Sequence, residues 1–183
     1  MKKITFLVLS GFLFFLGFSQ AAANENWRDI SSINELIGKW EGNRVVEIPR
    51  DTEMFIPKSA IEINVTIEYV RGSKEVNGSM RLDMNRFLTD WLNIGEIKML
   101  GFTKDFLWEL FVDALTALDD FTIGDNYTVF YDLSSDADDF FQNNSDGDIQ
   151  INGNGNRIRL LFFDTVSFGL GDEGFNEIVL DRR

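Results

Sequence analysis

The chain of 183 residues contains no cysteine and no histidine, and it has only two prolines. Without thiol or imidazole groups, the sequence excludes a cysteine nucleophile, a Ser-His-Asp relay, a zinc finger and a disulfide framework. Basic residues are also scarce, with 17 Lys and Arg against 30 Asp and Glu. The resulting net charge of -13 repels phosphate backbones, so we expect no nucleic-acid partner.

Residues 1–23 have the layout of a secretory signal peptide. Two lysines precede an almost unbroken apolar run over 4–18, and Ala21, Ala22 and Ala23 supply the small residues that a signal peptidase needs. The run is short for a membrane-spanning helix, which needs about 20 residues. We therefore predict a single mature domain over 24–183 with no membrane insertion after signal removal. An exported chain without cysteine is typical of the bacterial envelope, so we predict a periplasmic or secreted protein.

Apolar and polar residues alternate along most of the mature chain, which is typical of half-buried strands. The clearest alternation runs from Ile61 to Tyr69, and a second runs from Val76 to Met84. Between them, the segment 71–74 predicts a hairpin turn. Further strands are expected near 38–48, 126–133, 148–152, 157–166 and 176–182, with a tight hairpin over 152–156.

The segment 103–118 breaks this alternation, because its apolar residues follow the i, i+3, i+4, i+7 spacing of a helix. Thr103 is placed to cap this helix, and Asp105 lies in its first turn. We expect a shorter helix around 85–92 that ends near Gly95. The longer helix has three interpretations: a lid over an open barrel end, a structural cover over one face of the sheet, or a surface for a protein partner.

Gly38-Lys39-Trp40 opens the first long strand, and Arg182-Arg183 closes the last. This combination resembles the lipocalin superfamily, and more narrowly the small secreted lipocalin-like proteins of bacteria. The resemblance implies a mainly β fold: an antiparallel up-and-down barrel of about eight strands, here with a helical insertion near 103–118. It also implies that Gly38 and Trp40 close one barrel end and that Arg182 or Arg183 lies across the indole, where a cation–π contact is favourable. Because lipocalins carry their long helix after the barrel strands, a two-sheet sandwich stays open as the alternative fold.

Strand alternation places two charged residues, Arg44 and Asp164, on the inward apolar face. The Arg44 guanidinium is a candidate to bind a ligand carboxylate, because its fork matches that geometry. The alternatives are an internal pair between Arg44 and Asp164, or an Arg44 side chain that extends to the rim. Aromatic strand residues line an apolar pocket or fill the barrel core. The predicted ligand-binding residues are Arg44, Tyr69, Tyr131, Phe162 and Asp164.

The segment 136–148 is the most acidic stretch of the chain. Calcium prefers clustered oxygen ligands, but the spacing does not match an EF-hand loop. We interpret the segment as a solvated loop, with a weak calcium site left open and no metal site predicted. The pair Phe140-Phe141 is a candidate to anchor this loop onto the barrel.

No pair of carboxylates stands out for acid–base catalysis, so we predict no catalytic residue, no cofactor and no enzymatic activity. The leading hypothesis is an exported lipocalin-like protein that binds a small apolar or amphipathic ligand inside its barrel. The alternative is a ligand-free barrel that acts as a protein-interaction or inhibitor module in the cell envelope, with the helix 103–118 as a candidate partner surface.

Overall fold

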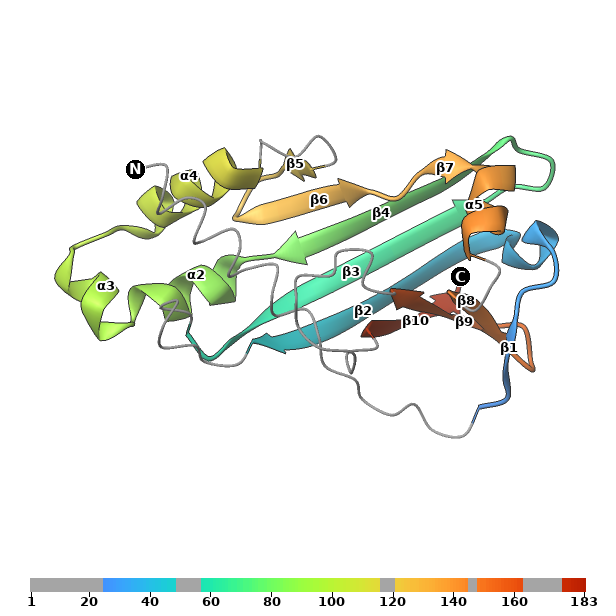
Figure 1. Cartoon of the computed structure of the whole chain (residues 1–183), viewed down its shortest axis with the longest axis horizontal. Coiled ribbons are helices and arrows are strands. Elements are labelled where there is room, and N and C mark those ends of the chain that lie inside the picture. Colours follow the sequence, from blue (N-terminus) through green and yellow to red (C-terminus); the bar gives the residue numbers. More distant parts are fainter. Residues whose placement is uncertain (1–24, 49–56, 116–120, 145–147, 163–175) are drawn as a thin grey trace.

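The computed structural model describes residues 25–48, 57–115, 121–144, 148–162 and 176–183. The predicted signal peptide and Asp164 fall outside these ranges. Within them, long strands run along the molecule, with short helices at both ends (Figure 1).

Ten strands form one sheet in which every strand pairing is antiparallel, so the prediction of a mainly β fold is confirmed. The strands are β1 (Trp27–Asp29), β2 (Gly38–Ile48), β3 (Ser59–Tyr69), β4 (Glu75–Asp83), β5 (Phe121–Ile123), β6 (Thr128–Asp132), β7 (Ser135–Asp136), β8 (Ile149–Asn152), β9 (Arg157–Phe162) and β10 (Asn176–Arg182). Their order is β1-β8-β9-β10-β2-β3-β4-β6-β5, and β7 pairs with β4.

The predicted closed barrel of about eight strands is wrong for the described residues, because the sheet is not closed. Its edge strands β1 and β5 pair on one side only. Strands β10 and β2 pair through Asp181 with Glu41 and Arg182 with Trp40, and beside these pairs the backbone of β10 at Val179 runs close against Gly42. At that point a methyl group on Gly42 would collide with the carbonyl oxygen of Val179, so only glycine allows this close approach.

The helices are η1 (Ile33–Leu36, a 3₁₀ turn), α2 (Asn85–Leu92), α3 (Gly95–Met99), α4 (Lys104–Leu115) and α5 (Ala137–Asn144). The predicted helix 85–92 is therefore confirmed, and the predicted helix 103–118 is confirmed over Lys104–Leu115, with 116–118 outside the described residues. Helix α3 begins at Gly95, where only an end was expected. Thr103 caps α4 as predicted, with its hydroxyl accepting a bond of 3.2 Å from the Phe106 backbone. None of the helices in the described ranges is long and apolar enough to cross a bilayer.

The acidic segment 136–148, which we expected to be a loop, instead contains the whole of α5. The Asp136 carboxylate accepts hydrogen bonds from the backbone of Asp138 at 2.9 Å and of Asp139 at 3.4 Å, which satisfies the first free N–H groups of the helix. Ala137 and Phe140, three residues apart, are buried in the core. One apolar helix face therefore anchors this segment, as the Phe140-Phe141 pair suggested.

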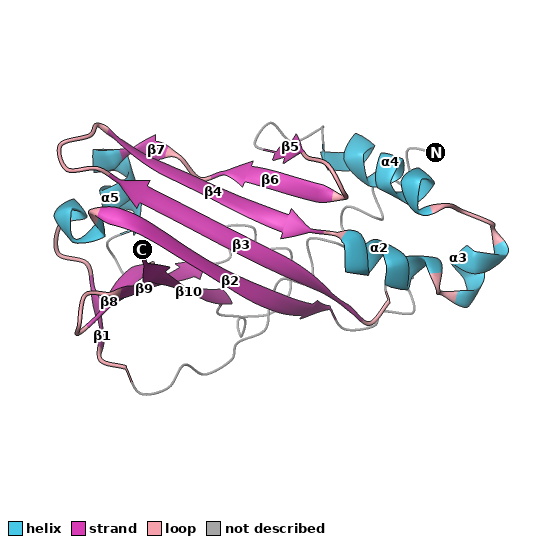
Figure 2. Cartoon of the chain, turned by 180° about the vertical axis from the view of Figure 1, so that it is seen from behind, coloured by secondary structure: helices cyan, strands magenta, loops and turns pink. Residues whose placement is uncertain are grey.

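Two hydrophobic clusters fill the molecule, and Ile63 and Met80 pack against both. The first surrounds the fully buried Trp40. The second lies at the helical end, where Leu107 and Phe111 of α4 are buried one helical turn apart (Figure 2). Among the three interpretations of this helix, the burial of these two residues supports the structural cover.

Candidate functional site

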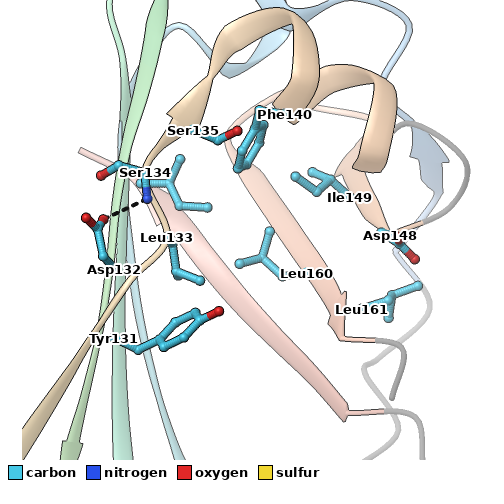
Figure 3. A pocket seen from close by; sticks show the side chains of 11 residues that line it. Tyr131, Asp132, Leu133, Ser134, Ser135, Phe140, Asp148, Ile149, Leu160 and Leu161 are labelled. Carbon is cyan, nitrogen blue, oxygen red and sulfur yellow. Dashed lines mark hydrogen bonds between the residues drawn. The ribbon is translucent and has the colours of Figure 1, made fainter. Parts of the chain in front are cut away.

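A pocket of about 280 Å³ lies between β3, the β6–β7 segment, α5 and the strands β8 and β9 (Figure 3). It is lined by Ile67, Tyr131, Asp132, Leu133, Ser134, Ser135, Phe140, Asp148, Ile149, Leu160 and Leu161. The volume is close to the lower end of small-molecule sites, which span roughly 300–1,000 Å³. The pocket therefore suits a small ligand rather than an extended lipid.

The apolar wall of the pocket belongs to the rigid core of the protein. Ile67, Phe140, Ile149 and Leu160 are all buried members of the Trp40 cluster. Phe140 reaches the pocket from α5, and Leu160 lies across from it on β9 (Figure 3). Because these side chains are held by the surrounding core, the apolar surface exists before any ligand binds.

Tyr131 supplies the polar group of this wall. Its ring packs against Phe121 with centroids 5.0 Å apart, and Figure 3 shows its hydroxyl directed toward the space beside Leu160. Within the described part of the chain, no hydrogen bond uses this hydroxyl. A phenolic hydroxyl both donates and accepts, so Tyr131 offers a ligand a hydrogen-bonding group next to the apolar side chains of the pocket.

The β6–β7 corner beside Tyr131 is held by Ser134. Its backbone donates to the Asp132 carboxylate at 2.8 Å, and its hydroxyl accepts from the Gly78 backbone at 3.1 Å. Hydrogen bonds from the Ser134 hydroxyl and backbone lower the pKa of Asp132 below its ordinary value. The Asp132 carboxylate turns toward this backbone rather than toward Leu160 (Figure 3), so it stabilises the rim without pointing into the pocket.

Of the predicted ligand-binding residues, the structure brings Tyr131 to the pocket. Tyr69 is buried in the core, and its hydroxyl donates to the Ser73 carbonyl at 3.5 Å. Arg44 donates to the carbonyl oxygen of Glu177 and is not part of the pocket lining. Phe162 ends β9 as the register partner of Asn176, but its side chain lies outside the described residues, as does all of Asp164.

Gly38, Trp40 and Arg182, which the sequence placed together at one barrel end, lie in contact. The Trp40 indole is fully buried and donates to the Leu36 carbonyl at 2.8 Å. The Arg182 guanidinium carbon lies 4.9 Å from the indole centroid. Gly38 has φ of 121°, and a Cβ there would lie 3.3 Å from the Arg182 Nε. Of the two C-terminal arginines, Arg182 covers Trp40, whereas Arg183 pairs with Glu41 at 3.1 Å.

Several pocket residues were not selected from the sequence. Phe140 carried a usable signal, because Ala137, Phe140 and Phe141 have the i, i+3, i+4 spacing of an amphipathic helix. Leu160 lies in the strand expected near 157–166 but was not among the predicted ligand-binding residues. Across the described ranges, no group of three or more acidic side chains is arranged to hold a metal ion.

Comparisons of the chain with protein-family models, with curated protein sequences and with solved structures gave no match.

Proposed function

We propose that this chain is an exported, lipocalin-like protein of the bacterial cell envelope that binds a small apolar or amphipathic molecule. The observation that carries the proposal is the pocket beside Tyr131, where buried apolar side chains form one wall and the Tyr131 hydroxyl is available for a hydrogen bond. Burial of apolar ligand surface drives binding at about 25 cal/mol per Å². The hydroxyl then orients the polar end of the ligand.

The contact between Trp40 and Arg182 supports the lipocalin-like part of the proposal. In the family that the sequence resembles, these positions close one end of the barrel. The pocket of this chain lies on the same hydrophobic cluster as Trp40. A site on this packed cluster is what we expect of a carrier that holds a small ligand.

The proposal is tested by native mass spectrometry of the protein purified from its own export compartment. We expect a stoichiometric small-molecule adduct that is lost on denaturation. Leu160→Trp fills the pocket and should abolish the adduct, whereas Val70→Trp, on an exposed hairpin position, should retain it. Ser135→Phe offers a second way of filling the pocket if Leu160→Trp lowers the midpoint of thermal unfolding. An adduct that survives both filling variants contradicts the assignment of the site.

A protein-interaction module is the second candidate function, and one observation favours it. Met99 and Leu100 are 88% and 63% exposed, and α3 has no buried residue. The helix lies at the far end of the molecule from α5 (Figure 1). Self-association through this tip is measured by sedimentation equilibrium, and the double variant Met99→Ser, Leu100→Ser should then be monomeric. A monomeric wild type that carries a ligand adduct favours the carrier instead.

A further inference from the structure

The pocket beside Tyr131 has no cationic side chain in its lining, although two aspartates, Asp132 and Asp148, are part of it. The whole chain carries a net charge of -13. A ligand carboxylate placed among Leu160, Ile149 and Phe140 would lose its hydration without gaining a counter-charge. Such a transfer is unfavourable because a charge in an apolar environment without a partner loses its hydration energy.

Two strand arginines, Arg159 and Arg44, do not supply a positive charge to the pocket. Arg159 precedes Leu160 on β9, so strand alternation directs its side chain to the opposite face of the sheet. There it donates to the Gln150 side chain at 2.7 Å and stacks 5.0 Å from the centroid of the Trp27 ring. Arg44 donates to the Glu177 carbonyl. Neither guanidinium is placed to receive a carboxylate in the pocket.

The hydroxyl of Tyr131 makes no hydrogen bond among the described residues and lies beside the apolar side chain of Leu160. The other polar side chains of the lining belong to the β6–β7 segment and to the start of β8: Asp132, Ser134, Ser135 and Asp148. The Tyr131 hydroxyl can donate to a carbonyl or accept from an alcohol, but it carries no charge to balance an anion. We infer, on the basis of the function proposed above, that the pocket selects an uncharged apolar ligand with one hydroxyl or carbonyl group at Tyr131. It discriminates against the carboxylate of the same chain length.

Isothermal titration calorimetry at pH 7 with 1-octanol and octanoate tests this selectivity on the purified exported protein. We expect 1-octanol to bind at least about tenfold more tightly than octanoate, since the anion is desolvated without a partner. Leu160→Trp should abolish binding of 1-octanol, which shows that the pocket is the site measured.

Tyr131→Phe removes the hydroxyl and keeps the ring. One net hydrogen bond corresponds to about a fivefold loss of affinity for 1-octanol. Tyr69→Phe is the matched control, because the Tyr69 hydroxyl bonds to the Ser73 carbonyl and lies outside the pocket lining. It should leave the affinity unchanged.

The outcomes separate the two proposals. If octanoate binds as tightly as 1-octanol in the wild type, or if Tyr131→Phe has no effect, the inferred selectivity is overturned while the carrier function stands. If neither probe binds and the purified protein carries no adduct, the carrier function itself is overturned.

Discussion

Arg182 and Trp40 are register partners across β10 and β2, and the guanidinium carbon lies 4.9 Å from the indole centroid. Arg182 also donates to the Ile37 carbonyl oxygen. Residues from the two ends of the domain thus meet at the edge of the Trp40 cluster. The contact joins β10 to β2 at the two register pairs that link these strands, Asp181 with Glu41 and Arg182 with Trp40.

Arg182→Ala should lower the free energy of unfolding by about 1–2 kcal/mol, because it removes a cation–π contact and a charge-assisted hydrogen bond. Arg183→Ala is the matched control. The Arg183 pair with Glu41 is exposed, so its loss should cost less than about 1 kcal/mol. Urea unfolding measures both values, and equal losses would show that the stacking contributes nothing of its own.

Trp40→Phe should destabilise the protein by about 2–4 kcal/mol, since it leaves a cavity and an unpaired Leu36 carbonyl. Trp91→Phe provides the comparison. Trp91 is also buried, but its Nε1 has no hydrogen-bond partner among the described residues, so the substitution removes volume and an unsatisfied donor together. The Trp91 variant should therefore be less destabilised in the same denaturant titration. The reverse ranking would contradict the importance of the Leu36 bond.

Gly42→Ala should destabilise the fold by about 1–3 kcal/mol, because the new methyl group meets the Val179 carbonyl and the Leu180 side chain. Gly95→Ala is the control at a glycine with open space around it. Within helix α3, alanine should be neutral or stabilise by up to about 1 kcal/mol. Thermal unfolding distinguishes the two variants: the midpoint should fall in Gly42→Ala and should stay the same or rise in Gly95→Ala. A stable Gly42→Ala protein would show that β10 need not approach β2 so closely.

Ser134→Ala should raise the pKa of Asp132 toward its ordinary value, because the hydroxyl bond is lost while the backbone bond remains. The pKa of Asp132 is lowered in the folded protein, so its stabilising contribution is present above the unfolded pKa of about 3.9. That contribution disappears as the pH falls through the folded pKa. The stability difference between wild type and variant should therefore shrink below about pH 4.

Carboxyl ¹³C NMR titration follows the Asp132 pKa directly, and acid unfolding follows the stability. Ser135→Ala removes the neighbouring hydroxyl, which makes no hydrogen bond to Asp132 in the described structure. It should leave this titration unchanged. An Asp132 pKa that does not move in Ser134→Ala would contradict the role of the serine at the corner.

Local patterns predicted most of the elements correctly. The apolar residues between Ile61 and Tyr69 do share one largely buried face of β3, because side chains alternate along any strand. The helical spacing after Thr103 marked α4 in the same way. The strands β1, β5 and β7 were missed, since two or three residues are too few to show alternation.

The acidic residues of α5 obscured its helical face in the sequence. The acidic composition favoured a solvated loop. In the structure, Ala137 and Phe140 pack on the hydrophobic core, and this packing holds the segment as a helix. That core includes Ile149, which follows in the next strand. A short helix of this kind is stabilised mainly by tertiary packing, which no local pattern contains.

The sequence by itself determined which residues alternate, where α2 and α4 lie, and that Trp40 stands in the first long strand and Arg182 in the last. These features depend on neighbours a few positions apart. Only the tertiary structure decided that the sheet stays open and that Tyr131 faces Leu160 across a pocket. Both depend on which strands pair and how closely they approach when they are distant in the chain, as Gly42 of β2 and Val179 of β10 do. A local periodicity contains no information about such distances.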